Sequence, residues 1–172
     1  NHTERIDEGC YHKIQKILDE TKLLIGHNLK FDLSWLLESG FKYDGNVYDT
    51  MIGEYILNRG IRKSLTLQMC CQRRKIGAKD DRIKEWMDRG ISFENIPADI
   101  VEEYGKIDVT ITRKLFDSQM EDLRADKNKH LLKTVKMMNE FLIVLTDMER
   151  NGININLEDL SQVEKEYRAE YA

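Results

Sequence analysis

Apolar positions recur along most of the chain at intervals of three and four residues, the spacing of an amphipathic helix. Capping and helix-ending residues set the limits of each segment. The expected helices cover residues 7–21, 29–38, 51–58, 64–75, 80–88, 97–123 and 129–150, and a last helix follows residue 155. Trp35 and the leucines after it are expected in the core.

Strand patterns are few and short. Residues 23–26 form an uninterrupted apolar run, typical of a buried parallel strand, and residues 46–48 predict a second strand. Ile153 and Ile155 alternate with asparagines and predict a third short strand. The order helix, strand, helix, strand indicates an α/β fold with a small sheet. Two core strands cannot cover about eight helices, so we expect further strands beyond this sequence.

Composition is that of a folded, helix-rich protein, with 41% hydrophobic and 34% charged residues in 172. Lys and Arg number 27 against 31 Asp and Glu, a formal net charge of −4. This balance argues against a protein that coats nucleic acid by charge alone. It leaves open an enzyme that holds cations over a few phosphates.

The chain offers no pattern of a membrane or zinc protein. Its longest uncharged apolar run, residues 141–146, is too short to span a bilayer, so no membrane partner is expected. The three cysteines, Cys10, Cys70 and Cys71, lack the spacing of structural zinc sites. Cys70 and Cys71 are interpreted as buried thiols, which favours a reducing cytoplasm.

Two pairs of polar residues have the spacing of one helix face. Asn28 and Asp32 follow the end of the first strand, where ligands bind in open α/β sheets. Tyr104 and Asp108 have the same spacing inside the long helix. Taken alone, each pair is more often a helix cap or a surface hydrogen bond. Asp49 we interpret as the cap of the helix that follows it.

Together with their surroundings, these pairs resemble the motifs of one family. Residues 24–32 resemble the second exonuclease motif, Asn-x₃-Asp, of the 3′–5′ proofreading domain of family A DNA polymerases, the bacterial DNA polymerase I kind. Tyr104-x₃-Asp108 resembles the third motif in its tyrosine form. The stretch 79–97 is similar to the versions of bacteriophage polymerases, residues 48–58 to the strand and helix after the second motif, and residues 148–155 to the junction with the polymerase domain.

The resemblance implies an RNase H-like fold that removes the 3′-terminal nucleotide of DNA with two divalent cations, Mg²⁺ or Mn²⁺. It implies that Asp108 binds the water-activating cation and Asp32 the second one. Tyr104 would orient the attacking water. Asn28 would lie near the second cation or the terminal nucleotide. The implied partner is a single-stranded or frayed 3′ end of DNA.

Other candidate contacts with DNA each have a structural alternative. Phe93 resembles a family aromatic near the bound strand, and a place in the core is about as plausible. His27 is a candidate substrate contact or a structural histidine. Residues 73–75 and the cations Lys79, Arg82 and Lys84 suit a DNA backbone, although a solvated helix face is the default interpretation.

The first motif of the family, Asp-x-Glu, has no acceptable match in this sequence. Asp147 and Glu149 have that spacing, but two residues apart on a helix they point to different sides. We therefore expect the motif and the first three sheet strands to precede residue 1. Residues 1–132 would be a partial exonuclease domain and residues 133–172 the start of a polymerase domain. These residues alone are expected to be inactive.

Two alternatives to a proofreading nuclease remain open. One is a scaffold that kept the exonuclease fold, lost its chemistry and braces a polymerase. The other is a free-standing exoribonuclease related to RNase D, which the polymerase-like junction at residues 148–155 disfavours. The expected location is the cytoplasm of a bacterial cell or of a phage-infected host.

Overall fold

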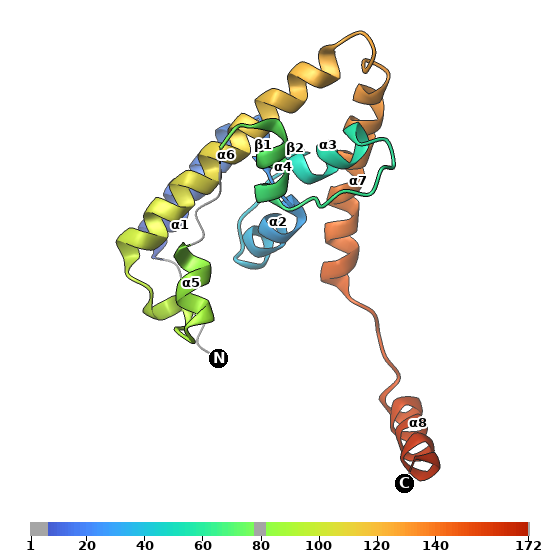
Figure 1. The fold of residues 1–172 in the computed structure, drawn as a ribbon. Coiled ribbons are helices and arrows are strands. Elements are labelled where there is room, and N and C mark those ends of the chain that lie inside the picture. Colours follow the sequence, from blue (N-terminus) through green and yellow to red (C-terminus); the bar gives the residue numbers. More distant parts are fainter. Residues whose placement is uncertain (1–6, 78–81, 172) are drawn as a thin grey trace.

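The computed structural model describes residues 7–77 and 82–171 and has a small sheet surrounded by helices (Figure 1). The elements before the long helix are α1 (Glu8–Glu20), β1 (Leu23–Gly26), α2 (Leu29–Glu38), β2 (Asn46–Asp49), α3 (Thr50–Leu57), α4 (Leu67–Arg74), α5 (Arg82–Asp88) and η1 (Phe93–Asn95). The elements after it are α6 (Ala98–Arg124), α7 (Leu131–Asn151) and α8 (Leu157–Glu170). The helix-rich α/β class is confirmed. Residues 78–81, which include Lys79 and the expected start of α5, lie outside the described ranges.

The sheet consists of β1 and β2 in parallel, joined by α2. Leu23 pairs with Asn46 and Gly26 with Asp49, so both strands end at the same edge. Within residues 7–77 and 82–171, β1 has no strand on its other side. The further strands expected there stay a prediction.

The strand expected at Ile153 and Ile155 is not formed. Residues 152–156 have no regular secondary structure and lead to α8, which lies apart from the other helices (Figure 1). An alternating pair of isoleucines forms a strand only where another strand accepts its backbone hydrogen bonds. The part of the chain that the structure describes offers no such edge here, and the prediction was wrong.

Helices α6 and α7 supply most of the cover for the sheet. Leu142 of α7 packs with Leu29, Leu33 and Val47 in one core cluster. Leu123 and Val135 pack with Tyr48 in a second. Helix α7 thus contributes to the core around the sheet, although nearly all of it follows the expected domain boundary at residue 132. That boundary stays a prediction.

Two expectations about burial need correction. Trp35 is 63% exposed, because Leu29 and Leu33 define the buried face of α2 and Trp35 lies two residues beyond Leu33, on another side. Phe93 in η1 is 50% exposed, so its interpretation as a core residue was wrong. The expected burial of Cys70 and Cys71 is confirmed, since both are fully enclosed.

Two of the cations expected on a solvated helix face are partly buried instead. Arg73 and Arg74 at the end of α4 contact the carboxylate of Glu54, which is 3% exposed. A buried carboxylate needs cationic partners, and the sequence pattern of α4 does not reveal it because Glu54 belongs to α3. None of the described helices combines the length and apolarity needed to cross a bilayer.

Candidate functional site

Asp32 and Asp108, which come from distant parts of the sequence, line one cavity of about 670 Å³. Asp32 belongs to the first turn of α2, and Asp108 lies within α6. The cavity borders β1 where that strand ends, at Gly26 and His27. The two carboxylates therefore share the position expected for a ligand site in an open α/β sheet.

The turn between β1 and α2 determines where Asp32 lies. Asn28 adopts a left-handed conformation, with φ of 61°, which asparagine tolerates better than most residues. A Cβ atom added at Gly26 would lie 2.6 Å from the Leu29 side chain, so the turn has no room for a residue larger than glycine unless Leu29 moves. Asn28 occupies the N-cap position of α2, but its side chain makes no cap hydrogen bond.

The caps of two helices come from one buried carboxylate. Asp49 is 1% exposed and accepts hydrogen bonds from the backbone N–H groups of Asn28 at 2.9 Å and Leu29 at 3.0 Å. It also accepts the N–H of Met51 at 2.8 Å, which caps α3 as the sequence predicted. A carboxylate at two helix N-termini satisfies orphan donors and complements both helix dipoles.

His27 links the end of β1 to its surroundings through both ring nitrogens. Nε2–H donates to the carbonyl oxygen of Leu65 at 2.8 Å, and Nδ1 lies 2.9 Å from the hydroxyl of Thr50. The ring thereby connects β1 with α3 and with the segment that precedes α4. These contacts match the structural interpretation of this histidine.

The environment of Asp32 disfavours its charged form. Although the residue is exposed as a whole, partial desolvation of its carboxyl group raises its pKa, and the Asp49 carboxylate raises it further. A backbone hydrogen bond opposes this shift. Cations held at Asp32 would remove the penalty, since they favour the deprotonated form.

Two other predicted site residues do not line this cavity. Tyr104 is half-buried on α6, one turn before Asp108, and is outside the described lining of the cavity. Phe93 lies in η1, again outside that lining. Among the described residues there is no cluster of three or more acidic, histidine or cysteine side chains able to hold a metal ion.

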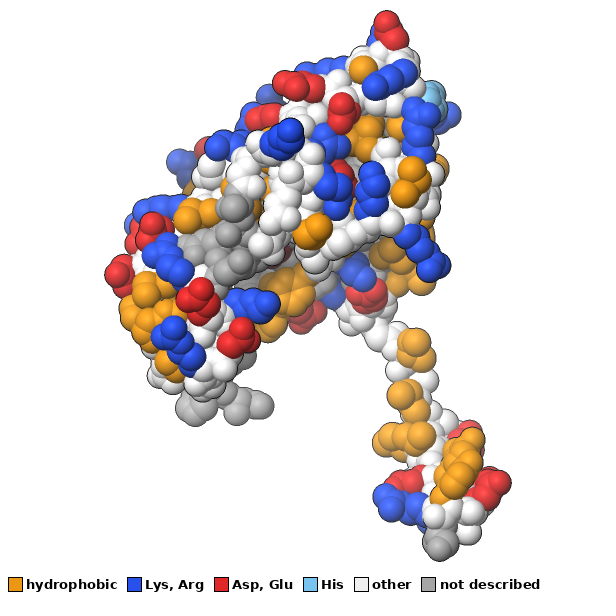
Figure 2. Space-filling model, viewed as in Figure 1, with side chains coloured by type: hydrophobic (Ala, Val, Ile, Leu, Met, Phe, Trp, Pro, Cys, Tyr) orange, Lys and Arg blue, Asp and Glu red, His pale blue; other side chains and the backbone are white. Residues whose placement is uncertain are grey.

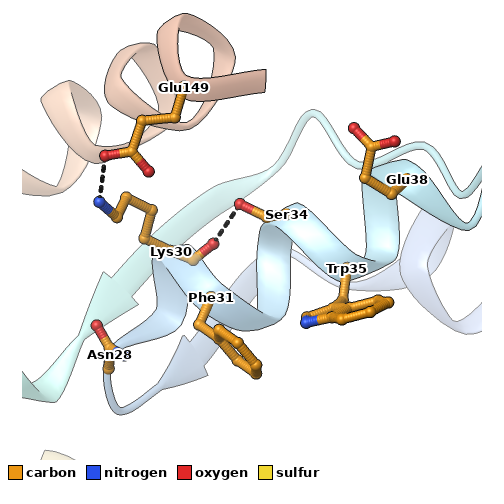
Figure 3. A pocket seen from close by; sticks show the side chains of 7 residues that line it. All are labelled: Asn28, Lys30, Phe31, Ser34, Trp35, Glu38 and Glu149. Carbon is orange, nitrogen blue, oxygen red and sulfur yellow. Dashed lines mark hydrogen bonds and ion pairs between the residues drawn. The ribbon is translucent and has the colours of Figure 1, made fainter. Parts of the chain in front are cut away.

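A neighbouring hollow of about 410 Å³ contains two residues that the sequence analysis missed (Figure 3). Asn28, Phe31 and Trp35 line it, and the two aromatic side chains project from the same side of α2. They are 61% and 63% exposed, with ring centroids 6.3 Å apart. Aromatic residues four apart on a helix, one of them adjacent to Asp32, are a signal that the sequence carried.

Ion pairs close the opposite wall of this hollow. Lys30 contacts Glu149 of α7 at 2.5 Å, and Arg150 contacts Glu38 at 2.9 Å (Figure 3 shows the first of these pairs). The side chains of all four residues are between 33% and 61% exposed. Ion pairs this exposed add little stability individually. They hold the end of α7 beside α2.

Comparisons with known proteins give a consistent result. Residues 2–124 match a family model described as 3′–5′ exonuclease, of family A DNA polymerases. The chain is 28% identical over 148 residues to DNA polymerase I of Borreliella burgdorferi, which covers 86% of the chain and 16% of that protein. It is 30% identical over 144 residues to DNA polymerase I of Chloroflexus aurantiacus, covering 82% of the chain and 15% of that protein. DNA polymerase I of Aquifex aeolicus is 28% identical over 163 residues, or 86% of the chain and 27% of that protein.

Proposed function

Because the chain belongs to the 3′–5′ exonuclease family of family A DNA polymerases, we propose that it removes 3′-terminal nucleotides from DNA as the proofreading part of a polymerase. The observation that carries the proposal is the shared cavity of Asp32 and Asp108 beside the end of β1. In the reaction, a water oxygen forms a bond to phosphorus and the bond to the 3′ oxygen breaks. The shortened strand keeps a 3′-hydroxyl, and a nucleoside 5′-monophosphate leaves.

Asp32 and Asp108 suit hard divalent cations, because carboxylate oxygens are the ligands that Mg²⁺ and Mn²⁺ prefer. Two such cations, when bound, activate the attacking water and offset charge on the phosphate oxygens. We propose that Asp108 holds the first cation and Asp32 the second. Two carboxylates supply too few ligands for both, and the described residues contain no cluster of three, so additional ligands are required.

Tyr104 and Asn28 are proposed to act on the water and on the terminal nucleotide. Tyr104 precedes Asp108 by one turn of α6, so its hydroxyl can orient a water that approaches the Asp108 carboxylate. Asn28 lies between the Asp32 cavity and the neighbouring hollow, and its amide makes no cap hydrogen bond. Its donors and acceptor are suited to the sugar and phosphate of the last nucleotide.

Exposed aromatic rings are proposed to hold the frayed strand. Phe31 and Trp35 expose their rings on α2, the helix that also carries Asp32, and stacking of bases on aromatic rings tolerates any sequence. Phe93 is a further candidate, on account of its exposed ring. His27 already uses both ring nitrogens within the fold, so its proposed contact with substrate is limited to the ring carbons.

The proposed partners are a single-stranded 3′ end of DNA and a polymerase domain in the same chain. The chain spans only 16% and 15% of the length of the first two curated relatives. The DNA polymerase activity that their name indicates is therefore also a proposal for this protein. We propose that residues 133–172 begin the polymerase domain. The proposed location is the cytoplasm of a bacterium or of a phage-infected host, since the relatives are bacterial.

The test is degradation of a 5′-labelled single-stranded DNA by the intact protein, with Mg²⁺ or Mn²⁺. We expect stepwise shortening from the 3′ end, slowed on the order of a hundredfold or more in Asp108→Ala. Asp99→Asn, an exposed carboxylate on the same helix, is the matched control and should cleave normally. Absence of cleavage by the unaltered protein would indicate the scaffold alternative, and shortening of RNA but not DNA would indicate an exoribonuclease.

A further inference from the structure

A pocket of about 620 Å³ lies where the C-terminal end of α3 meets α4 and the connection between α6 and α7. Five cationic and two acidic side chains line it, in a chain whose net charge is −4. Figure 2 shows Lys and Arg side chains gathered over this part of the surface. We call it the basic pocket. At the helical rise, Asp122 in its wall lies about 20 Å along α6 from Asp108.

Both acidic groups of the basic pocket are already neutralised. Glu54 receives Arg74 Nε at 2.8 Å and Arg73 Nη2 at 3.3 Å. Arg74 Nη1 also contacts Asp122 at 2.7 Å. Two arginines are therefore used for two carboxylates. The remaining three cations leave a local excess of positive charge.

Those three cations are Arg59, Lys63 and Lys127, and within the described ranges none of them has a carboxylate partner. Arg59 Nη2 donates to the carbonyl oxygen of Lys127 at 3.2 Å and to Asn128 Oδ1 at 2.7 Å. Both acceptors are neutral, so they hold the guanidinium in place without compensating its charge. Asn128 is itself 7% exposed and fixed by a bond to the Asp122 carbonyl oxygen at 2.9 Å.

The backbone of Arg59 has a left-handed conformation. Its φ of 50° places a long side chain in the left-handed region, which glycine or asparagine occupies at lower cost. Arg59 directly follows the C-cap of α3, a position where a left-handed residue commonly ends a helix. From there its guanidinium reaches the pocket wall at Asn128.

Donors also exceed acceptors around the basic pocket. Among the described residues, the buried atoms Asn58 Nδ2 and Arg73 Nε have no hydrogen-bond partner, and both residues line this pocket. Buried donors normally find an acceptor, so a site with surplus donors and surplus positive charge suits an anion. Planar, forked guanidinium donors and lysine ammonium groups match the oxygens of phosphate.

We propose that the basic pocket binds a phosphate group, with Arg59 as the oriented donor and Lys63 and Lys127 as charge partners. The phosphate comes either from a nucleic-acid backbone or from a free phosphate or nucleotide. The pocket is separate from the Asp32–Asp108 cavity, and its occupation does not depend on the proposed nuclease reaction. The segment that carries Lys63 also carries Leu65. The carbonyl oxygen of Leu65 accepts a hydrogen bond from His27, which lines that cavity.

The test measures binding to the intact protein in EDTA, so that cleavage and metal binding do not contribute. Inorganic phosphate is titrated by calorimetry, and a labelled single-stranded oligonucleotide by fluorescence anisotropy. Lys127→Gln is expected to weaken phosphate binding about tenfold. Lys133→Gln, an exposed lysine outside the pocket that removes the same charge, should leave it unchanged.

The oligonucleotide distinguishes the two sources of phosphate. If the pocket holds a backbone phosphate, Lys127→Gln also weakens oligonucleotide binding and lowers the slope of log affinity against log salt by about 0.7. If it holds a free phosphate, only the titration with inorganic phosphate changes. Equal behaviour of Lys127→Gln and Lys133→Gln in both titrations would overturn the proposal. Loss of cleavage in Asp108→Ala alone bears only on the nuclease site.

Discussion

The carboxylate of Asp49 accepts a hydrogen bond of 2.9 Å from the backbone N–H of Asn28, and this contact ties the start of α2 to the end of β2. The helix that carries Asp32 therefore begins where a buried side chain of the adjacent strand holds it. Placement of the candidate cation ligand depends on a residue with no assigned role in the chemistry.

We expect Asp49→Ala to destabilise the protein by about 2–4 kcal/mol, because one buried and two partly buried N–H groups lose a charged acceptor. Urea denaturation of the intact protein measures the change. Asp44→Ala, an exposed aspartate in the segment before β2, is the control and should change stability by less than about 0.5 kcal/mol. Equal stability of the two variants would contradict the capping role.

Asp32→Asn is expected to stabilise the metal-free protein at pH 7. Because folding raises the pKa of Asp32, its deprotonation weakens the folded state as the pH rises through that pKa. The amide cannot ionise, so it escapes this loss. Below the ordinary pKa of an aspartate the difference should vanish, since both chains are then neutral at this position.

Thermal denaturation midpoints in EDTA at several values between pH 3.5 and pH 7.5 test this expectation. Asp99→Asn serves as control, because that carboxylate is exposed at the start of α6 and should show no matching trend. An Asp32→Asn midpoint that falls below that of the unaltered protein at pH 7 would mean that the carboxylate stabilises the fold instead.

The three cysteines should differ in their reaction with a thiol reagent. Cys10 is exposed, whereas burial raises the pKa of Cys70 to about 11 and also raises that of Cys71. At pH 8 a thiol with that pKa is ionised on the order of 0.1%, and the enclosed sulfur is inaccessible as well. Of these three thiols, one should react fast in the native protein, and all three should react fast in denaturant.

Trp35→Ala is expected to weaken binding of a single-stranded oligonucleotide roughly five- to a hundredfold in EDTA, through loss of base stacking. Fluorescence anisotropy measures the affinity. Phe141→Ala removes an aromatic ring that is 47% exposed on α7 and should have no effect. Equal affinities for all three proteins would remove Trp35 from the proposed strand-binding surface.

Sequence patterns predicted the elements around the site closely. Residues 23–26 and 29–38 form a strand and a helix with the predicted limits, because an uninterrupted apolar run and a helical period are local signals. The approach of Asp32 to Asp108 is not a local property. It was expected only through the resemblance of two motifs to one family, and the shared cavity agrees with it.

Errors arose where burial depends on distant segments. The pattern around Trp35 does not reveal which side of α2 the later helix α7 covers. Likewise, Arg73 and Arg74 form a basic pair at the end of α4, and only the packing of α3 beside them reveals the buried Glu54. Long-range contacts of this kind decide exposure, and a periodic pattern carries no information about them.

Helix α7 has a consequence for the order in which the protein folds during synthesis. Asn139 accepts the backbone N–H of Asp49 at 2.6 Å across 90 residues, and Leu142 completes the cluster around Leu29 and Leu33. A nascent chain that ends before α7 leaves that apolar face uncovered and the N–H without its acceptor. The ribosome must therefore release residues up to about Leu142 before β1, α2 and β2 can reach their native packing, so a translational pause before this helix prolongs the exposure of aggregation-prone surface.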